Sequence, residues 1–437
     1  METVGIIGLG EIGWRMGKLL IAAGHPVVGY DISPPASKRA AGDGVAIAGS
    51  VADLCQRSDI IITCVTDGAA LRDVVMGDDG VVASLQPGTP LIDTTSAEPW
   101  ITREVVSSLS ERGIPFLDAP VSGGVPAAEQ GKMNFMVGGE AALIERCSPL
   151  LKRLGPVIMH VGPVGAGHTI KAINMLALAS SMVATAELAT AGRHAGIPLE
   201  TMIARLEAGI GASYSTRVHF PRYIVSGNYA SGFSFDLMLK DLTIGAGIAD
   251  QAALPLFMVR TTLELYRVAA NTNLHGSDNT RLIEQILGES SPDRPDDRPH
   301  EDIQNFEIVA AWFNAVIGAE AICLGVASGL TPRTVIDVLS AGSGESRSLS
   351  NDLADYLYAD SPDTCRSLAE VSAAFRPVMA RAQAAAVPAS LLAQAAFVHA
   401  AAVRRFGDAA DSRCVLDLLA AWTGQGERLS RFKESGS

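Results

Sequence analysis

The feature that most constrains the fold is an internal repeat, because one long segment of the chain matches a later segment at a constant displacement. Residues 171–291 align without gaps to residues 304–424, at a displacement of 133 positions. The coinciding landmarks include Glu187 with Glu320, Gly196 with Gly329, Tyr223 with Tyr356, Pro255 with Pro388, and Asp278 with Asp411. Landmarks that keep one register are typical of a duplicated domain. The alternative is that two alanine-rich helical segments match by composition alone.

The repeated segments differ in composition and in hydrophobic pattern from the chain that precedes them. From about Gly167 onward, long runs rich in alanine, leucine and methionine indicate helices only. Residues 1–160 instead alternate amphipathic stretches with short apolar runs at Val4–Ile7, Val27–Tyr30, Ile60–Val65, Pro90–Asp93, Phe116–Asp118 and Asn134–Val137. Alternating strands and helices predict a parallel α/β sheet. The predicted fold class is an α/β amino-terminal domain followed by an all-α domain that is internally duplicated.

Between the two copies lies GESSPDRPDDRPHED, whose prolines and like charges are typical of a linker. We therefore predict an α/β domain at 1–163, a first helical domain at 164–288, a linker at 289–302, a second helical domain at 303–424 and a tail at 425–437.

The charge balance and the residue types limit the class of partner. The chain has 34 lysines and arginines against 47 acidic residues, a net charge of −13, which argues against binding nucleic acid or an anionic membrane and favours a small solute. The first residues, METVGIIGLG, lack the basic start of a signal peptide, and the apolar runs around 175–186 and 391–403 are shorter than a membrane span. The six cysteines show no CxxC spacing and the eight histidines show no metal-ligand spacing. We expect a cytoplasmic protein without a metal site.

A glycine-rich turn, Gly8-Leu9-Gly10-Glu11-Ile12-Gly13, directly follows the first predicted strand and opens the first helix. In this context the first glycine permits a tight turn, the second lets backbone N–H groups approach a pyrophosphate, and the third allows the helix to pack closely on the strand. The helix N-terminus then favours the phosphate charge. The sequence therefore predicts a Rossmann domain that binds a dinucleotide.

Asp31 ends the second strand, where a carboxylate accepts hydrogen bonds from the ribose hydroxyls of NAD and repels the 2′-phosphate of NADP. Lys38 and Arg39 follow closely, so NADP stays an alternative to NAD.

A second glycine-rich turn, DAPVSGG, ends a later strand and offers the Ser122 hydroxyl with the N–H groups of Gly123 and Gly124 as a nest for a carboxylate. The alternative is an ordinary glycine-rich turn with a capping serine and no ligand. Lys171 and Asn174 lie three residues apart at the start of a long helix, so both can project from one face. On its own, a lysine there is more often a solvated charge.

The motifs GLGEIG, DAPVSGG, GAGHTIKAIN and FDLMLKDL, in this order, closely resemble the β-hydroxyacid dehydrogenase family over about residues 1–290. The resemblance implies NAD(P)-dependent reversible oxidation of a small β-hydroxy acid such as 3-hydroxyisobutyrate. It also implies that Ser122 and Gly123 hold the substrate carboxylate, beside Gly124 of the same nest. Lys171 is then the general acid/base, and Asn174 orients the substrate. The cofactor contacts expected are Gly8, Leu9, Gly10, Glu11, Ile12, Gly13, Asp31, Val65, Ser96 and Lys240.

The second copy lacks these residues, because Lys171 aligns with Gln304, Asn174 with Glu307, and Lys240-Asp241 with Ala373-Ala374. We expect it to be structural and to pack on the first copy about a pseudo-twofold axis, replacing a subunit contact in a monomer or homodimer. Departures within the first copy are Met175, where family members often carry an amide, and Trp14, where they carry a small residue.

Two other functions stay open. The 6-phosphogluconate dehydrogenases share the layout, but no KxxHN follows here, since the stretch reads KAINM. A non-catalytic NAD-binding scaffold is the other alternative. Substrate identity is not determined by the sequence, and the residues expected near the pocket walls are Tyr214, Arg217, Phe233 and Phe235.

Overall fold

The computed structural model describes residues 1–288, 303–359, 365–384 and 389–434. The chain forms two compact units, Met1–Ala172 and Ile173–Ser437, and the division falls within helix α9 (Ala166–His194).

The first unit is built on a nine-stranded sheet in the order β3-β2-β1-β4-β5-β6-β8-β7, with β9 paired to β8. Strands β1 to β6 are parallel, and β8 is antiparallel to β6 and β7. The strand bounds are β1 Val4–Ile7, β2 Val27–Tyr30, β3 Ala46–Ile47, β4 Ile60–Thr63, β5 Leu91–Asp93, β6 Phe116–Asp118, β7 Val121–Ser122, β8 Asn134–Gly138 and β9 Val157–Gly162. The order of β1 to β6 confirms the predicted Rossmann domain.

Helices cover both faces of this sheet, as the alternation of buried side chains requires. Ile6 packs in one apolar cluster and the next residue, Ile7, in the other, because successive strand residues point to opposite faces. The first cluster contains residues of α1 and α8, and the second contains residues of α3 to α6. The helix bounds are α1 Gly13–Ala22, α2 Pro34–Gly42, α3 Val51–Gln56, α4 Gly68–Met76, α5 Val81–Ser84, α6 Pro99–Glu111, α7 Gly124–Gln130 and α8 Ala141–Leu154.

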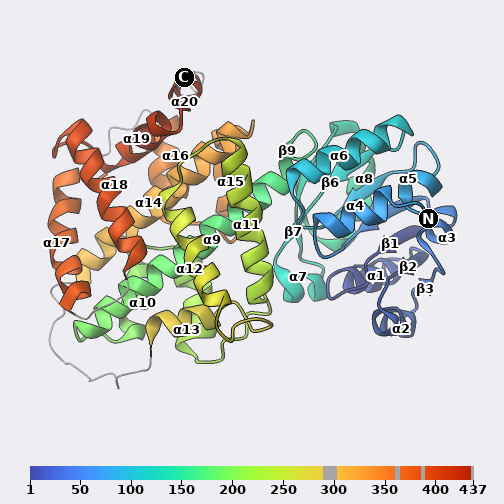
Figure 1. The fold of residues 1–437 in the computed structure, drawn as a ribbon, viewed down its shortest axis with the longest axis horizontal. Coiled ribbons are helices and arrows are strands. Elements are labelled where there is room, and N and C mark those ends of the chain that lie inside the picture. The colour runs from blue at the N-terminus through green and yellow to red at the C-terminus, as the bar shows by residue number, and fades with distance from the viewer. Residues whose placement is uncertain (289–302, 360–364, 385–388, 435–437) are drawn as a thin grey trace. The chain divides into compact units, whose positions relative to one another are not determined.

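The described part of the second unit is helical, and its β pairing is limited to isolated bridges. After α9 its elements are α10 Leu199–Ala208, η1 Ser215–Val225, α11 Phe235–Gln251, α12 Phe257–Ala270, α13 Arg281–Leu287, α14 Ile303–Ala327, α15 Pro332–Ala341, η2 Ser348–Leu353, α16 Ala354–Tyr358, α17 Leu368–Ala384, α18 Ser390–Phe406, η3 Ser412–Cys414, α19 Val415–Trp422 and α20 Gly426–Glu434. Helix α14 packs against α15, α17, α18 and α19 (Figure 1). The predicted linker and part of the predicted tail lie outside the described residues.

The structural elements recur at the displacement that the sequence repeat predicts. Helices α10 and α15 begin and end at positions 133 residues apart, and so do α11 and α17. Helices α12 and α18 begin 133 residues apart. The isolated bridges Ser234–Asp278 and Ser367–Asp411 are also related by this displacement. These correspondences support the interpretation that the helical domain is duplicated.

The contacts between the two copies are reciprocal. Glu187 of α9 accepts hydrogen bonds from the N–H groups of Leu391 and Leu392, at 3.0 and 2.9 Å, at the start of α18. Its counterpart Glu320 of α14 accepts hydrogen bonds from the N–H groups of residues 257–259 at the start of α12. Burial raises the pKa of each of these two carboxyl groups to about 7, and their hydrogen bonds to backbone N–H groups oppose that rise.

The same reciprocity appears where two loops cross. Ser213 and Ser346 form an isolated antiparallel bridge, and these residues are counterparts at the displacement of 133. The Tyr214 N–H donates to the Glu345 carbonyl, and the Arg347 N–H donates to the Ala212 carbonyl, each at 2.9 Å. A pair of hydrogen bonds in which each copy plays both parts is the signature of an isologous, twofold contact. The described contacts therefore favour the pseudo-twofold packing that we predicted.

Two of the helices are longer than the apolar runs in the sequence indicate, so the expectation that every apolar segment is shorter than a membrane span was wrong. Helices α9 and α14, with 29 and 25 residues, are long and apolar enough to cross a membrane, although the apolar runs in the sequence had looked too short. Their most apolar windows are 100% and 89% buried inside the protein, and core helices pass the same test by length and composition.

Candidate active site

The glycine-rich turn between β1 and α1 has the backbone that a dinucleotide requires. Gly8 has a φ of +96°, and a Cβ atom there would lie 2.2 Å from the Cys64 carbonyl oxygen. A Cβ atom on Gly13 would lie 2.0 Å from the Gly8 carbonyl oxygen, whereas one on Gly10 would meet no atom within 4 Å. The first and third glycines are thus required by packing, and the second leaves its backbone open to a ligand. These residues fit a bound pyrophosphate.

Asp31, directly after β2, supports this turn. Its carboxylate accepts hydrogen bonds from the N–H groups of Leu9, at 2.6 Å, and Ser33, at 2.7 Å. Each oxygen retains a second lone pair for a ribose hydroxyl. Asp31 therefore both braces the turn and fits the ribose contact that the sequence predicts.

Arg39, which the sequence places only a few residues after Asp31, contacts the glycine-rich turn directly. Its guanidinium donates to the Leu9 carbonyl at 3.1 Å and to Glu11 at 2.5 Å, and it lies over the Trp14 ring at 4.4 Å. Glu11 also accepts a hydrogen bond from Arg15, and this contact and Arg39 hold the pKa of Glu11 below its ordinary value although burial opposes them. A cation therefore lies at the edge of the cofactor turn, close to Asp31.

Val65 and Ser96 follow β4 and β5, the next strands of the sheet after β1. The Val65 N–H donates to the Thr95 hydroxyl at 3.2 Å, which links the two strand ends. Both predicted cofactor residues thus lie at the carboxyl edge of the parallel sheet, where open α/β sheets bind ligands.

The second glycine-rich turn follows β7. Ser122 is 7% exposed, and Gly123 and Gly124 have φ values of +107° and +62°. A Cβ atom on Gly123 would lie 2.4 Å from the Cβ of Ala127 on α7. A buried hydroxyl beside two left-handed glycines at the start of a helix fits the predicted nest for a carboxylate.

A buried polar network that the sequence analysis missed anchors the start of α9. Asp118, at the end of β6, accepts hydrogen bonds from the N–H groups of Gly165, at 2.8 Å, and His168, at 2.9 Å. The His168 ring contacts the Thr102 hydroxyl at 2.7 Å, and its Nε2 lies 3.2 Å from an Asp93 oxygen. The His168 and Asp93 side chains are fully buried. The available signals were aspartates that end two strands and a histidine in GAGHTIKAIN.

The charges in this network favour a protonated histidine. Burial opposes protonation of His168, but the carboxylates of Asp93 and Asp118 outweigh it and raise its pKa above the ordinary value. Burial also raises the pKa of Asp118, against the hydrogen bonds and the histidine charge. The network fixes the first turn of α9, three residues before Lys171.

Lys171 and Asn174 are both buried, with exposed fractions of 8% and 0%. The Asn174 amide nitrogen donates to the Ser343 hydroxyl, and its oxygen accepts from the Gly344 N–H, each at 2.9 Å. Both ends of this amide therefore contact the loop after α15 in the second copy, which could not be predicted from the sequence, and its nitrogen also lies 3.8 Å from the Met175 sulfur. Lys240 lies on α11, 24% exposed, with its ammonium 3.5 Å from Asp241.

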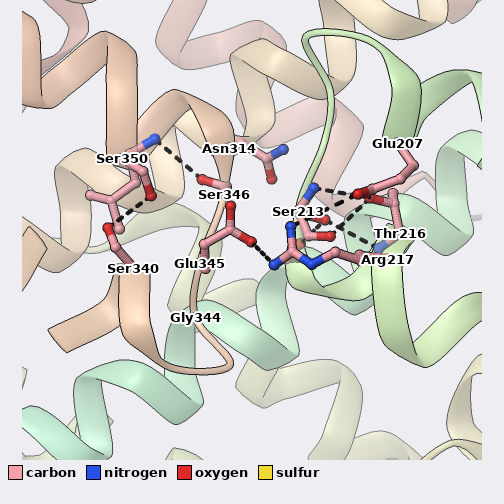
Figure 2. Close-up of polar contacts among 12 residues, drawn as sticks. Glu207, Ser213, Thr216, Arg217, Asn314, Ser340, Gly344, Glu345, Ser346 and Ser350 are labelled. Atoms are coloured by element: carbon pink, nitrogen blue, oxygen red, sulfur yellow. Dashed lines mark hydrogen bonds and ion pairs between the residues drawn. The ribbon is translucent and has the colours of Figure 1, made fainter. Parts of the chain in front are cut away.

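Two of the expected pocket-wall residues have partners within the helical unit. Arg217 forms an ion pair with Glu345 of the other copy, and its guanidinium lies 3.8 Å from the Glu207 carboxylate (Figure 2). Phe235 is fully buried, and its ring stacks on Tyr266 at 5.4 Å. Phe235 is therefore part of the packed interior of this unit, and Arg217 forms an ion pair between the two copies. Within the described ranges, no three histidine, cysteine or acidic side chains form a group that could hold a metal ion.

Two family models match most of this chain. Residues 3–162 match the family model for the NAD binding domain of 6-phosphogluconate dehydrogenase. Residues 165–286 and 307–419 match the model for the NAD-binding region of NADP-dependent 3-hydroxyisobutyrate dehydrogenase. Both models describe NAD-binding regions, which supports the prediction of NAD with NADP as the alternative.

Mitochondrial 3-hydroxyisobutyrate dehydrogenase of Mus musculus is 32% identical over 295 residues, 66% of this chain and 88% of that protein. The structure of Mycobacterium tuberculosis 3-hydroxyisobutyrate dehydrogenase with L-serine has a TM-score of 0.62 and 29% identity, covering 65% of this chain and 99% of that one. Plasmodium falciparum 6-phosphogluconate dehydrogenase has a TM-score of 0.65 at 14% identity and covers 90% of this chain and 91% of that one. This last likeness shows the fold alone, but it extends over most of the chain.

The glycine turn and the DAPVSGG turn lie within the first matched segment, and Lys171 lies within the second. The chain also covers 88% of a 32% identical 3-hydroxyisobutyrate dehydrogenase. The chain belongs to the β-hydroxyacid dehydrogenase family.

Proposed function

We propose that this chain is an NAD(P)-dependent dehydrogenase that reversibly oxidises the hydroxyl group of a small β-hydroxy acid similar to 3-hydroxyisobutyrate, with Lys171 as the general acid/base. The observation that carries the proposal is the burial of Lys171 on a helix whose first turn is held by Asp118 and His168. Burial disfavours the charged ammonium form of a lysine, and this makes a buried lysine better suited than a solvated one to accept a proton near neutral pH.

The residues of the chain divide the chemistry between them. Bound NAD(P) supplies the acceptor for the hydride that leaves the carbinol carbon. In oxidation, the Lys171 Nζ accepts the proton of the substrate hydroxyl, and in reduction it returns a proton to that oxygen. The Ser122 hydroxyl and the N–H groups of Gly123 and Gly124 hold the substrate carboxylate. Asp31 binds the adenosine ribose, with NAD as the expected cofactor.

The test is a screen of short β-hydroxy acids with NAD and with NADP, run on the wild type, Lys171→Ala and Lys171→Arg. Arginine keeps the charge but cannot release a proton, so both variants are expected to lose about 100-fold to 10,000-fold in turnover. Binding of NADH, followed by its fluorescence, is expected to persist. A variant that loses only substrate affinity while turnover stays intact would overturn the assigned role.

The same screen, with 6-phosphogluconate added to the acids, separates the two alternatives. Turnover of 6-phosphogluconate in place of unphosphorylated acids would favour a 6-phosphogluconate dehydrogenase-like enzyme. That alternative is supported by the match of residues 3–162 to the model for the NAD binding domain of such enzymes and by likeness of fold over most of the chain. NAD binding without turnover of any acid would favour a scaffold.

We also propose that the second helical copy replaces a contact that single-copy relatives obtain from a partner subunit. The reciprocal hydrogen bonds of Glu187 and Glu320 support this proposal, because each copy caps a helix of the other. Size-exclusion chromatography with light scattering is expected to give a monomer or a homodimer, whereas a tight tetramer with both copies on its surface would count against it.

A further inference from the structure

The loop that follows α15 holds the helix that carries the proposed acid/base. Residues 342–344 of this loop lie against Asn174 of α9. The Asn174 amide donates to the Ser343 hydroxyl and accepts from the Gly344 N–H. Because the amide is fully buried and held at both ends, its position is set by the second copy.

The loop approaches the helix too closely to carry larger residues. A Cβ atom on Gly342 would lie 2.6 Å from the Asn174 amide oxygen, and one on Gly344 would lie 3.1 Å from it. The Gly344 position also faces the Asn174 carbonyl and the Ala177 methyl group, each at 3.1 Å. The contact therefore spans about one turn of α9, immediately after Lys171.

The counterpart contact on the other side of the pseudo-twofold lacks this chemistry. Glu307 occupies the position of Asn174 and pairs with Arg205 at 2.8 Å. Ile210 occupies the position of Ser343. The corresponding helix, α14, has the exposed Gln304 where α9 has the buried Lys171. The neutral two-point contact thus occurs only on the side that carries the lysine.

We propose that the Ser343–Gly344 segment of the second copy is a positioning element for the dehydrogenase reaction, which fixes Asn174 and, through helix α9, the turn that carries Lys171. The proposal rests on the proposed function. It makes Asn174 a positioning residue, in place of the substrate contact that the family resemblance implies. The second copy thereby contributes to turnover, although it has none of the proposed catalytic residues.

The experiment compares kcat, KM and the pH profile of kcat for Asn174→Ala, Ser343→Ala and Ser343→Thr with those of the wild-type chain. Loss of the contact is expected to lower kcat between about 10-fold and 100-fold for Asn174→Ala, because small misplacements of a reacting group are costly. Ser343→Ala is expected to lose less, and threonine, which keeps the hydroxyl, to restore most of the loss. KM for the hydroxy acid is expected to stay within about twofold, and the pH profile is expected to shift.

Glu307→Ala is the matched control, because it removes the counterpart side chain from a helix without the lysine. It is expected to leave kcat and the pH profile unchanged even if the melting temperature falls. Wild-type kcat and pH profile in Asn174→Ala and Ser343→Ala would overturn the proposal, as would a rise in KM confined to Asn174→Ala, which would indicate direct substrate contact.

Lys171→Ala separates the two proposals. If Lys171→Ala is inactive while the loop variants behave as wild type, only the positioning role fails. If Lys171→Ala retains turnover, the acid/base role of Lys171 fails, and if the wild-type chain turns over no hydroxy acid, the proposed function itself fails.

Discussion

The two copies of the helical domain have matching helices and matching packing contacts, but they differ in the side chains at the corresponding positions. In both copies a glycine pair, Gly209 and Gly211 or Gly342 and Gly344, packs against the long helix of the other copy. The residue that these glycines face is Glu307 in one case and Asn174 in the other. Packing and helix capping are therefore symmetric, whereas the neutral amide and the buried lysine occur on one side only. Two segments with matching helices and matching packing can therefore still differ at the few positions to which we assign the chemistry.

The largest expected effect tests this asymmetry directly. Lys171→Ala is expected to lower turnover by about 100-fold to 10,000-fold, because proton transfer from a positioned side chain contributes that much. Its counterpart variant, Gln304→Ala, is expected to have wild-type turnover. Steady-state kinetics on the best acid of the screen provide the comparison. A comparable loss in Gln304→Ala would remove the functional distinction between the copies.

The symmetric carboxylates Glu187 and Glu320 predict a pH dependence shared by both sides. Each has a pKa of about 7 in the folded chain against an ordinary 4.5, so between these values the folded chain holds a proton that the unfolded chain has lost. The free energy of unfolding therefore falls as pH rises from about 4.5 to 7, by up to about 3 kcal/mol for each group.

Denaturant unfolding of the wild type and of Glu187→Gln/Glu320→Gln, at intervals from pH 5 to pH 8, measures this dependence. The double variant is expected to have the flatter profile, since glutamine does not titrate. Identical profiles in the two proteins would show that these carboxyl groups do not titrate in that range.

Removing either cap alone tests whether the two sides are equal. Glu187→Ala and Glu320→Ala each leave the first N–H groups of a buried helix end without an acceptor, at α18 or α12. Each substitution is expected to lower the free energy of unfolding by about 2 kcal/mol. Unfolding in urea at pH 7 gives both values, and a difference of several kcal/mol between them would show that the symmetry is geometric but not energetic.

The smallest effect is expected at the loop crossing. Arg217 pairs with Glu345 but is nearly half exposed, and its counterpart is Ser350. Arg217→Ala is expected to lower the free energy of unfolding by only about 0.5 kcal/mol, because exposed ion pairs contribute little. Ser350→Ala, from the matching position, is the control. A loss above about 2 kcal/mol in Arg217→Ala would place this pair among the main contacts between the copies.

Local features could be predicted from the sequence because their physics is local. The turn from Gly8 to Gly13 and the carboxylate of Asp31 follow from backbone sterics and from the order of strand, turn and helix. The contact of His168 with Thr102 could not be predicted, because 66 positions separate the two residues and no periodicity relates them. The Ser343 and Gly344 partners of Asn174 are 169 and 170 positions away, in the copy that the sequence predicts to be structural.

The sequence alone predicts two helical copies in one register, and it sets the glycines of the first glycine-rich turn and the residue types that the chain offers for proton transfer. These depend on repeated landmarks and on steric limits that act between neighbours in the chain. The tertiary structure alone decided which carboxylate caps which helix and that Asn174 is held by Ser343 and Gly344. Hydrogen bonds of this kind join groups that only the packing of distant helices brings within 3 Å or so of each other.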